Sequence, residues 1–175
     1  MLNSGSHSYR FWHAMSKEIA TDLPGSLVRH EYAPLLECIP IHSNTLPPFH
    51  ATNLVTILDD GDLMIVDPGA NDAGQPHLEA VLERIAPQRL HVFLTHHHHD
   101  HIQSLDLVER LFPEAVVIGH PYTLKKLKPS NLKHVEVCAS DKDEVYHIGS
   151  REVTCVSLPG HTRGHLALWE PSSKT

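Results

Sequence analysis

The chain has 175 residues, of which 41% are hydrophobic and 20% are charged, and its formal net charge is −7. This length and balance are ordinary for one soluble globular domain with a buried core. The negative charge disfavours broad, non-specific binding to nucleic acid, and no apolar stretch approaches the ~20 residues that span a bilayer.

The first part of the chain predicts an N-terminal extension over residues 1–25, with a short helix over 15–20. It lacks the apolar run of a secretory signal peptide, although a short organellar transit segment stays open. We therefore expect a protein of the cytoplasm or of an organellar matrix, not a secreted one. The cysteines are few, odd in number and far apart, which favours single buried thiols in a reducing compartment over a disulfide framework. They are Cys38, Cys138 and Cys155.

The residues that follow predict strands joined by a loop and a hairpin. The prolines of the loop over 42–50 exclude a central strand there. The segment Asp59-Asp60-Gly61-Asp62 is a hairpin turn signal between two β-branched, apolar runs. The expected strands in this part span residues 26–32, 35–41, 53–58 and 63–66.

Farther along, helices alternate with strands. Apolar residues spaced for one helical face predict helices over 75–86 and 102–112, and Pro121 opens a helix to about residue 127. Strands are expected over 90–94, 115–118, 135–137, 144–148, 153–158 and 166–169. Early hairpins followed by alternation predict an α/β fold, a mixed sheet with helices packed outside. Such folds place their chemistry on loops at the carboxyl ends of strands.

A histidine-rich segment, Thr-His-His-His-His-Asp-His, occupies residues 95–101 directly after an expected buried strand. Residues two apart in an extended backbone point to the same side, so His96 and His98 can bind one ion. A turn then directs Asp100 and His101 at a neighbouring ion. Imidazoles with a carboxylate suit zinc, one ion or two, with iron or manganese as alternatives.

The intervening histidines, His97 and His99, are expected to be spacers that point away from the ion. A second histidine motif, Pro159-Gly160-His161-Thr162-Arg163-Gly164-His165, follows the strand expected over 153–158. The turn at its Pro-Gly pair exposes His161. Together with His96 and His98, this residue gives three imidazoles and leaves a fourth position for water, which is the pattern of catalytic rather than structural zinc.

These motifs resemble those of metallo-β-lactamase-fold hydrolases over residues 53–169. The matching elements are Asp67 in Val-Asp-Pro-Gly, the H-x-H-x-D-H run, His161 and His165. The resemblance implies an αββα sandwich with one or two metals. It implies that His96, His98 and His161 bind the first metal and that Asp100 and His101 begin the second site. Asp67 would support the site through hydrogen bonds. His165 is either such a supporting contact or an ordinary packing residue.

Within this family, residues 46–54 and 160–168 are most similar to lactamase-like endoribonucleases and their plant or algal relatives. Glyoxalase II-type thioesterases share the same metal motifs. Ile102-Gln103-Ser104 stands where such proteins often carry a Gly-Gly pair. The family also supplies a bridging aspartate and a last histidine from the second half of its fold. We therefore expect residues 26–175 to form a domain of this type that is incomplete at its C-terminal end.

The resemblance implies a hydrolase in which a metal-bound hydroxide attacks an ester, thioester or phosphodiester, with Asp100 as the catalytic carboxylate that orients it. Two alternatives stay open: an inactive, truncated metal-binding module, and an iron-dependent oxidoreductase on the same fold. The substrate would be a small ester or thioester, or an RNA. A second copy or another partner is a candidate source of the missing site residues, and no membrane partner is expected.

Two further groups of residues have alternative readings. His42 and His50 on the proline-rich loop either line a substrate cleft or are ordinary surface histidines. A basic stretch either contacts RNA phosphates or is a solvated helix face. It consists of Lys125, Lys126, Lys128 and Lys133.

Overall fold

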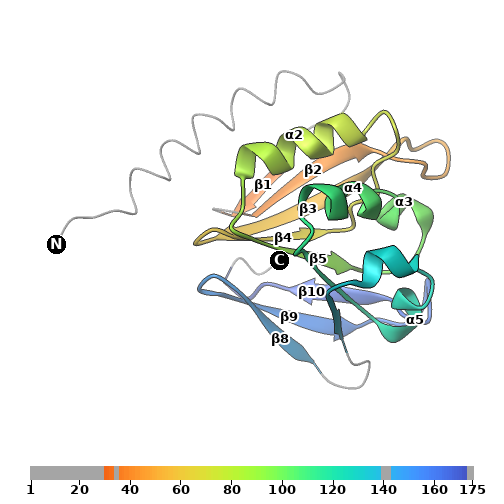
Figure 1. Cartoon of the computed structure of the whole chain (residues 1–175). Coiled ribbons are helices and arrows are strands. Elements are labelled where there is room, and N and C mark those ends of the chain that lie inside the picture. The colour runs from red at the N-terminus through yellow and green to blue at the C-terminus, as the bar shows by residue number, and fades with distance from the viewer. Residues whose placement is uncertain (1–29, 34–35, 139–142, 173–175) are drawn as a thin grey trace.

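The computed structural model describes residues 30–33, 36–138 and 143–172 (Figure 1). The N-terminal extension and the helix expected over 15–20 lie outside these residues. The larger of two sheets has the order β1-β2-β3-β4-β5-β6-β7 and the smaller has the order β10-β9-β8. The strands of the larger sheet are β1 (His30–Ala33), β2 (Leu36–His42), β3 (Ala51–Asp59), β4 (Asp62–Val66), β5 (Arg89–Leu94), β6 (Val116–Gly119) and β7 (Val135–Val137). Those of the smaller sheet are β8 (Glu144–Ile148), β9 (Arg151–Ser157) and β10 (Leu166–Trp169).

Neighbouring strands of the larger sheet run antiparallel from β1 to β4 and parallel from β4 to β7. The predicted hairpin joins β3 to β4, and both Asp60 and Gly61 have the positive φ that a tight hairpin turn requires. The parallel strands are connected by helices, namely α2 (Gln75–Ile85), α3 (His99–Ile102), α4 (Leu105–Leu111), α5 (Pro121–Leu124) and a 3-10 turn over Pro129–Leu132. This is the mixed α/β sheet that the sequence predicts.

Side chains on the two faces of the larger sheet build two separate cores. In β4, Leu63 and Ile65 belong to the core beneath helices α2 and α4, whereas Met64 belongs to the core between the two sheets. Phe93 of β5 also lies between the sheets. A strand buried on both faces is apolar at successive positions, as the runs 63–66 and 90–94 are.

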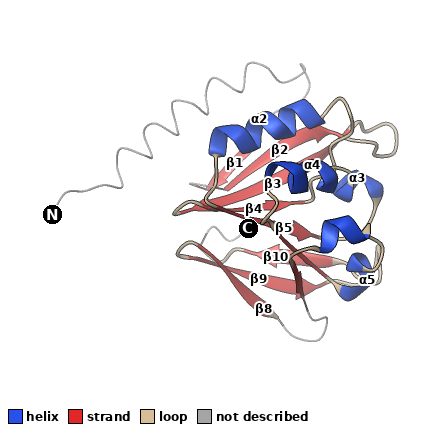
Figure 2. Ribbon diagram, viewed as in Figure 1, coloured by secondary structure: helices blue, strands red, loops and turns tan. Residues whose placement is uncertain are grey.

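The layers seen in Figure 2 are helices, the larger sheet and the smaller sheet, in that order. In the described part of the chain, no helix lies over the outer face of the smaller sheet. Three of the four layers of an αββα sandwich are therefore present there. None of the helices in this part is long and apolar enough to cross a bilayer.

The helix predicted over 102–112 is two helices, and the first begins earlier, at His99. The break lies at Ser104, whose side chain is fully buried. The Ser104 backbone N–H donates to the carbonyl of Pro68 at 2.9 Å, and its hydroxyl donates to the carbonyl of Ala70 at 2.7 Å. These bonds tie the helix junction to the loop after β4, an interaction that local periodicity does not contain.

The cysteine prediction is right about burial and wrong about pairing. All three cysteines are buried, and Cys38 is a free thiol whose pKa is raised by burial. Cys138 and Cys155, however, form a disulfide that links the end of β7 to β9 in the other sheet. The count and spacing of cysteines carry no information about two strands that the fold packs together. The compartment stays a prediction.

Candidate metal centre

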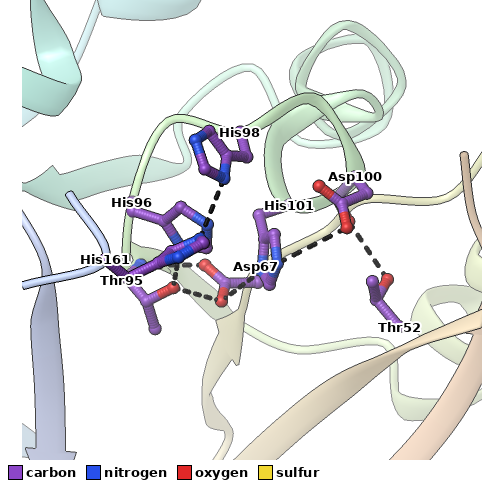
Figure 3. A network of polar contacts seen from close by, with 8 residues as sticks. All are labelled: Thr52, Asp67, Thr95, His96, His98, Asp100, His101 and His161. Carbon is purple, nitrogen blue, oxygen red and sulfur yellow. Dashed lines mark hydrogen bonds and ion pairs between the residues drawn. The ribbon is translucent and has the colours of Figure 1, made fainter. Parts of the chain in front are cut away.

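Three chain segments meet at one edge of the two sheets. Asp67 follows β4 and Thr95 follows β5, and these strands are parallel neighbours with Val66 beside Phe93. The third segment, residues 158–165, connects β9 to β10 and carries His161. It is fixed to the others where the Leu166 N–H donates to the Thr95 carbonyl at 2.9 Å. Figure 3 shows the side chains that gather here.

The first cluster consists of His96, His98 and His161, whose candidate ligand atoms all lie within 4.8 Å of one another. His161 Nε2 lies 3.0 Å from His98 Nδ1. His96 is 3% exposed, and its Nε2 is buried without a hydrogen-bond partner. Because buried polar atoms nearly always have partners, a nitrogen that lacks one beside two other imidazoles fits a metal ligand.

The protonation state of His96 also suits the binding of a cation. Burial, followed by the neighbouring His101 and His98, lowers the pKa of His96 to about 3. The ring is therefore neutral at physiological pH, which is the form of histidine that binds metals. The donor set of the described residues thus fits a divalent ion that prefers imidazole.

Asp67 supports both halves of the site. Its Oδ1 accepts the Thr95 N–H at 2.8 Å, and its Oδ2 accepts the Thr95 hydroxyl at 2.6 Å and His101 Nδ1 at 2.9 Å. Its φ is +57°, a left-handed conformation that aspartate tolerates better than most side chains. The hydrogen-bonding role implied for Asp67 therefore has a geometric basis, and a backbone strained at such a residue is typical of functional sites.

A second cluster comprises Asp67, His96 and His101. Burial lowers the pKa of His101, but the hydrogen bond and charge of Asp67 and the charge of Asp100 outweigh it, so that the pKa is raised overall. The Asp100 carboxylate lies 3.7 Å from His101 Nε2. The turn expected between the two halves of the histidine run is present, since His98 is extended and α3 starts at the next residue.

Backbone contacts hold Asp100 and His101 against the loop after β4. A Cβ atom placed on Gly69 would lie 1.6 Å from the Asp100 carbonyl oxygen and 2.7 Å from the His101 nitrogen. Only glycine permits this approach. On the other side, the Thr52 hydroxyl donates to the same Asp100 carbonyl at 3.1 Å.

The remaining histidines of the two motifs differ in position. The His165 ring is stacked on the His96 ring, with centroids 5.0 Å apart and planes 9° apart, so it packs directly against the cluster. Burial, followed by the charge of His161, lowers its pKa. His99 is exposed, as expected of a spacer, whereas His97 is half-buried, with its ring 5.4 Å from the Tyr122 ring and 5.2 Å from the His98 ring.

The other candidate residues lie outside the two clusters. His42 and His50 contact each other at the base of the proline-rich loop, where His42 Nδ1 lies 3.2 Å from the His50 carbonyl. Two lysines of the basic stretch form ion pairs, Lys128 with Asp106 and Lys133 with Glu109. Lys125 and Lys126 are exposed, which fits a solvated face.

Sequence reasoning missed Thr95, Gly69 and Ser104. Thr95 precedes the histidine run but has no place in the H-x-H-x-D-H spacing. Gly69 was visible only as a turn residue. Ser104 stood out only as a departure from a Gly-Gly pair. Their roles depend on contacts between segments that are 28 or more residues apart in the chain.

Comparison with known proteins agrees with this arrangement. Residues 47–175 match the model of the metallo-beta-lactamase superfamily. A hydroxyacylglutathione hydrolase of Aeromonas hydrophila is 36% identical over 129 residues, which cover 71% of this chain and 45% of that one. The chain thus spans about half the length of that curated relative.

Solved structures show the same fold at low identity. A beta-lactamase domain protein from Burkholderia ambifaria has a TM-score of 0.65 and 23% identity, with 88% of this chain and 56% of that one covered. The metallo-beta-lactamase IND-7 has a TM-score of 0.63 and 17% identity, with 86% and 69% covered. At these identities the likeness concerns the fold alone.

Proposed function

This chain belongs to the metallo-β-lactamase superfamily, and from that premise we propose that it is a zinc-dependent hydrolase whose ion lies among His96, His98 and His161. One observation carries the proposal: imidazoles from two distant motifs converge around a buried His96 nitrogen that has no partner. Zinc suits such a three-histidine set best, with iron or manganese as competitors.

Residues around the proposed ion have separate roles. When bound, the ion would supply a Lewis acid and a water that loses its proton near neutral pH. We assign Asp100 the role of accepting a hydrogen bond from the attacking water, because its carboxylate lies 3.7 Å from His101 Nε2, although it belongs to neither candidate cluster. Asp67 holds His101 through a direct hydrogen bond to Nδ1, which leaves Nε2 on the side of the Asp100 carboxylate.

We propose a small acyl thioester as the substrate class. The support is the 36% identity to a hydroxyacylglutathione hydrolase over most of this chain. The net charge of −7 also disfavours a polyanion. RNA is the competing substrate, suggested by the resemblance of residues 46–54 and 160–168 to endoribonucleases. RNA binding would weaken steeply with salt, whereas thioester binding would not.

The test measures zinc content and hydrolysis of a hydroxyacyl-glutathione thioester by the whole chain. His98→Ala should abolish zinc-dependent turnover and leave the circular dichroism spectrum unchanged. His147→Ala, which changes an exposed histidine of β8, is the matched control and should behave as wild type. Full turnover by His98→Ala would disprove the assignment.

A second candidate is a metal-binding module without turnover. In the described residues, the two clusters share His96, so they are not two independent metal sites. Such a module would bind about one zinc per chain and hydrolyse neither the thioester nor RNA. An iron-dependent oxidoreductase would instead show visible absorption after purification.

A further inference from the structure

Thr95 uses each of its polar atoms at the junction of the three site segments. Its N–H and hydroxyl both contact the Asp67 carboxylate, at 2.8 and 2.6 Å. Its hydroxyl oxygen also lies 2.9 Å from His96 Nδ1. Its carbonyl accepts the Leu166 N–H at 2.9 Å, at the start of β10. No other described threonine touches both a site carboxylate and a candidate ligand ring.

The direction of these hydrogen bonds follows from counting protons. An ionised carboxylate only accepts, and a hydroxyl has a single proton to donate. At 2.6 Å from Asp67, the Thr95 hydroxyl donates to that carboxylate. The hydroxyl oxygen can then only accept from His96, which places the His96 ring proton on Nδ1. The other ring nitrogen, Nε2, keeps its lone pair.

The nitrogen with the free lone pair is the buried one that has no partner. It is also the nitrogen that must be bare for the ring to bind an ion from this side. We propose that Thr95 is a positioning residue, which relays the Asp67 carboxylate to His96 and fixes the tautomer that exposes Nε2 to the metal. The proposal rests on the proposed metal centre and deepens it.

The relay differs from the contact that Asp67 makes with His101. Asp67 Oδ2 accepts directly from His101 Nδ1 at 2.9 Å, so one carboxylate sets the proton position on two rings. His101 is reached without an intermediate, whereas His96 is reached only through the Thr95 hydroxyl. Loss of this hydroxyl should therefore weaken the first cluster and leave the Asp67–His101 contact in place.

The experiment is a zinc titration of the whole chain against a competing chromophoric chelator. Thr95→Val keeps the shape of the side chain but removes the hydroxyl, and it should weaken zinc binding by about 10–100-fold. Thr95→Ser keeps the hydroxyl and should bind within about threefold of wild type. Thr154→Val makes the same substitution at a half-buried position of β9 and should leave the affinity unchanged.

A second measurement reads the tautomer directly and needs no metal. Two-bond ¹H–¹⁵N correlation spectra distinguish protonated from bare ring nitrogens, and His96→Gln identifies the His96 signals. Metal-free wild type and Thr95→Ser should show Nδ1 protonated and Nε2 bare, and Thr95→Val should show a mixture. A wild-type His96 protonated on Nε2 overturns the relay, as does unchanged zinc affinity in a folded Thr95→Val.

These readouts separate the relay from the proposed reaction. Zinc binding that depends on the hydroxyl, without thioester turnover, would reject the proposed hydrolase and keep the relay. If the wild type hydrolyses the thioester and Thr95→Val binds zinc normally, the proposed hydrolase is kept and the relay is rejected. If the wild type binds no zinc, the metal centre fails and the tautomer spectrum alone decides on the Thr95 hydrogen bonds.

Discussion

Replacing Gly69 by alanine should damage the candidate centre without touching any side chain in it. The new Cβ would lie 1.6 Å from the Asp100 carbonyl oxygen and 2.2 Å from its carbonyl carbon. Because ordinary contact begins near 3.4 Å, the loop after β4 and the start of α3 must separate by roughly 1.8 Å. Both obstructing atoms are backbone, so no side-chain rotation relieves the clash.

Two losses should follow from this displacement. Overpacking of this kind typically costs about 2 kcal/mol of unfolding free energy, which lowers Tm by about 4–8 °C in a chain of this size. Moving Asp100 and His101 away from Asp67 should also lower catalytic turnover by about 100-fold, since misplacement by an ångström has that effect.

The assay is urea unfolding of the metal-free chain together with zinc titration and thioester turnover. Gly160→Ala is the matched control, because a Cβ there meets no atom within 4 Å although the residue lies next to His161. It should match wild type in all three measurements. If Gly69→Ala unfolds at the same urea concentration as Gly160→Ala and retains turnover, the close approach does not position α3 and the reasoning is wrong.

Two further substitutions and the addition of zinc also test the structure. Ser104→Ala removes a buried hydrogen bond to Ala70 and should lower the unfolding free energy by about 1–2 kcal/mol in urea melts. The Arg89 hydrogen bond holds the pKa of Asp62 below its usual range, so this pair stabilises the fold above about pH 4. That stability is lost as pH falls through the lowered pKa, and Asp62→Asn should flatten this part of the acid unfolding curve; an unchanged curve would contradict it. Zinc at 100 times its Kd should stabilise the wild type by about 2.7 kcal/mol and raise Tm by about 5–10 °C in calorimetry, and a chelator should reverse the rise.

Short-range patterns predicted the elements because each depends on residues close in sequence. The Asp-Gly turn, the doubly buried strands and the one-sided helix over 75–86 all appear within a few residues of their expected ends. The break at Ser104 was missed because its cause lies in carbonyls 34 and 36 residues earlier. The Cys138–Cys155 disulfide was missed because it joins the two sheets, whose packing no local signal contains.

The candidate site divides in the same way. Spacing selected His96 and His98, and the Pro-Gly turn together with this first motif selected His161; the structure brings the three rings together. Spacing could not select Thr95 or Gly69. Their importance comes from atoms that approach across the loop after β4, and such distances exist only once the chain is folded.

His98 and His161 are 63 residues apart in the chain, yet their ring nitrogens lie 3.0 Å apart. An ion bound between them would close a chain loop of that length, as a covalent cross-link does, and closure of long loops restricts the unfolded chain strongly. Zinc would then act on the folding equilibrium as well as on chemistry. The backbone amides of the smaller sheet should exchange their hydrogens more slowly once the ion links the loop before β10 to the segment that follows β5.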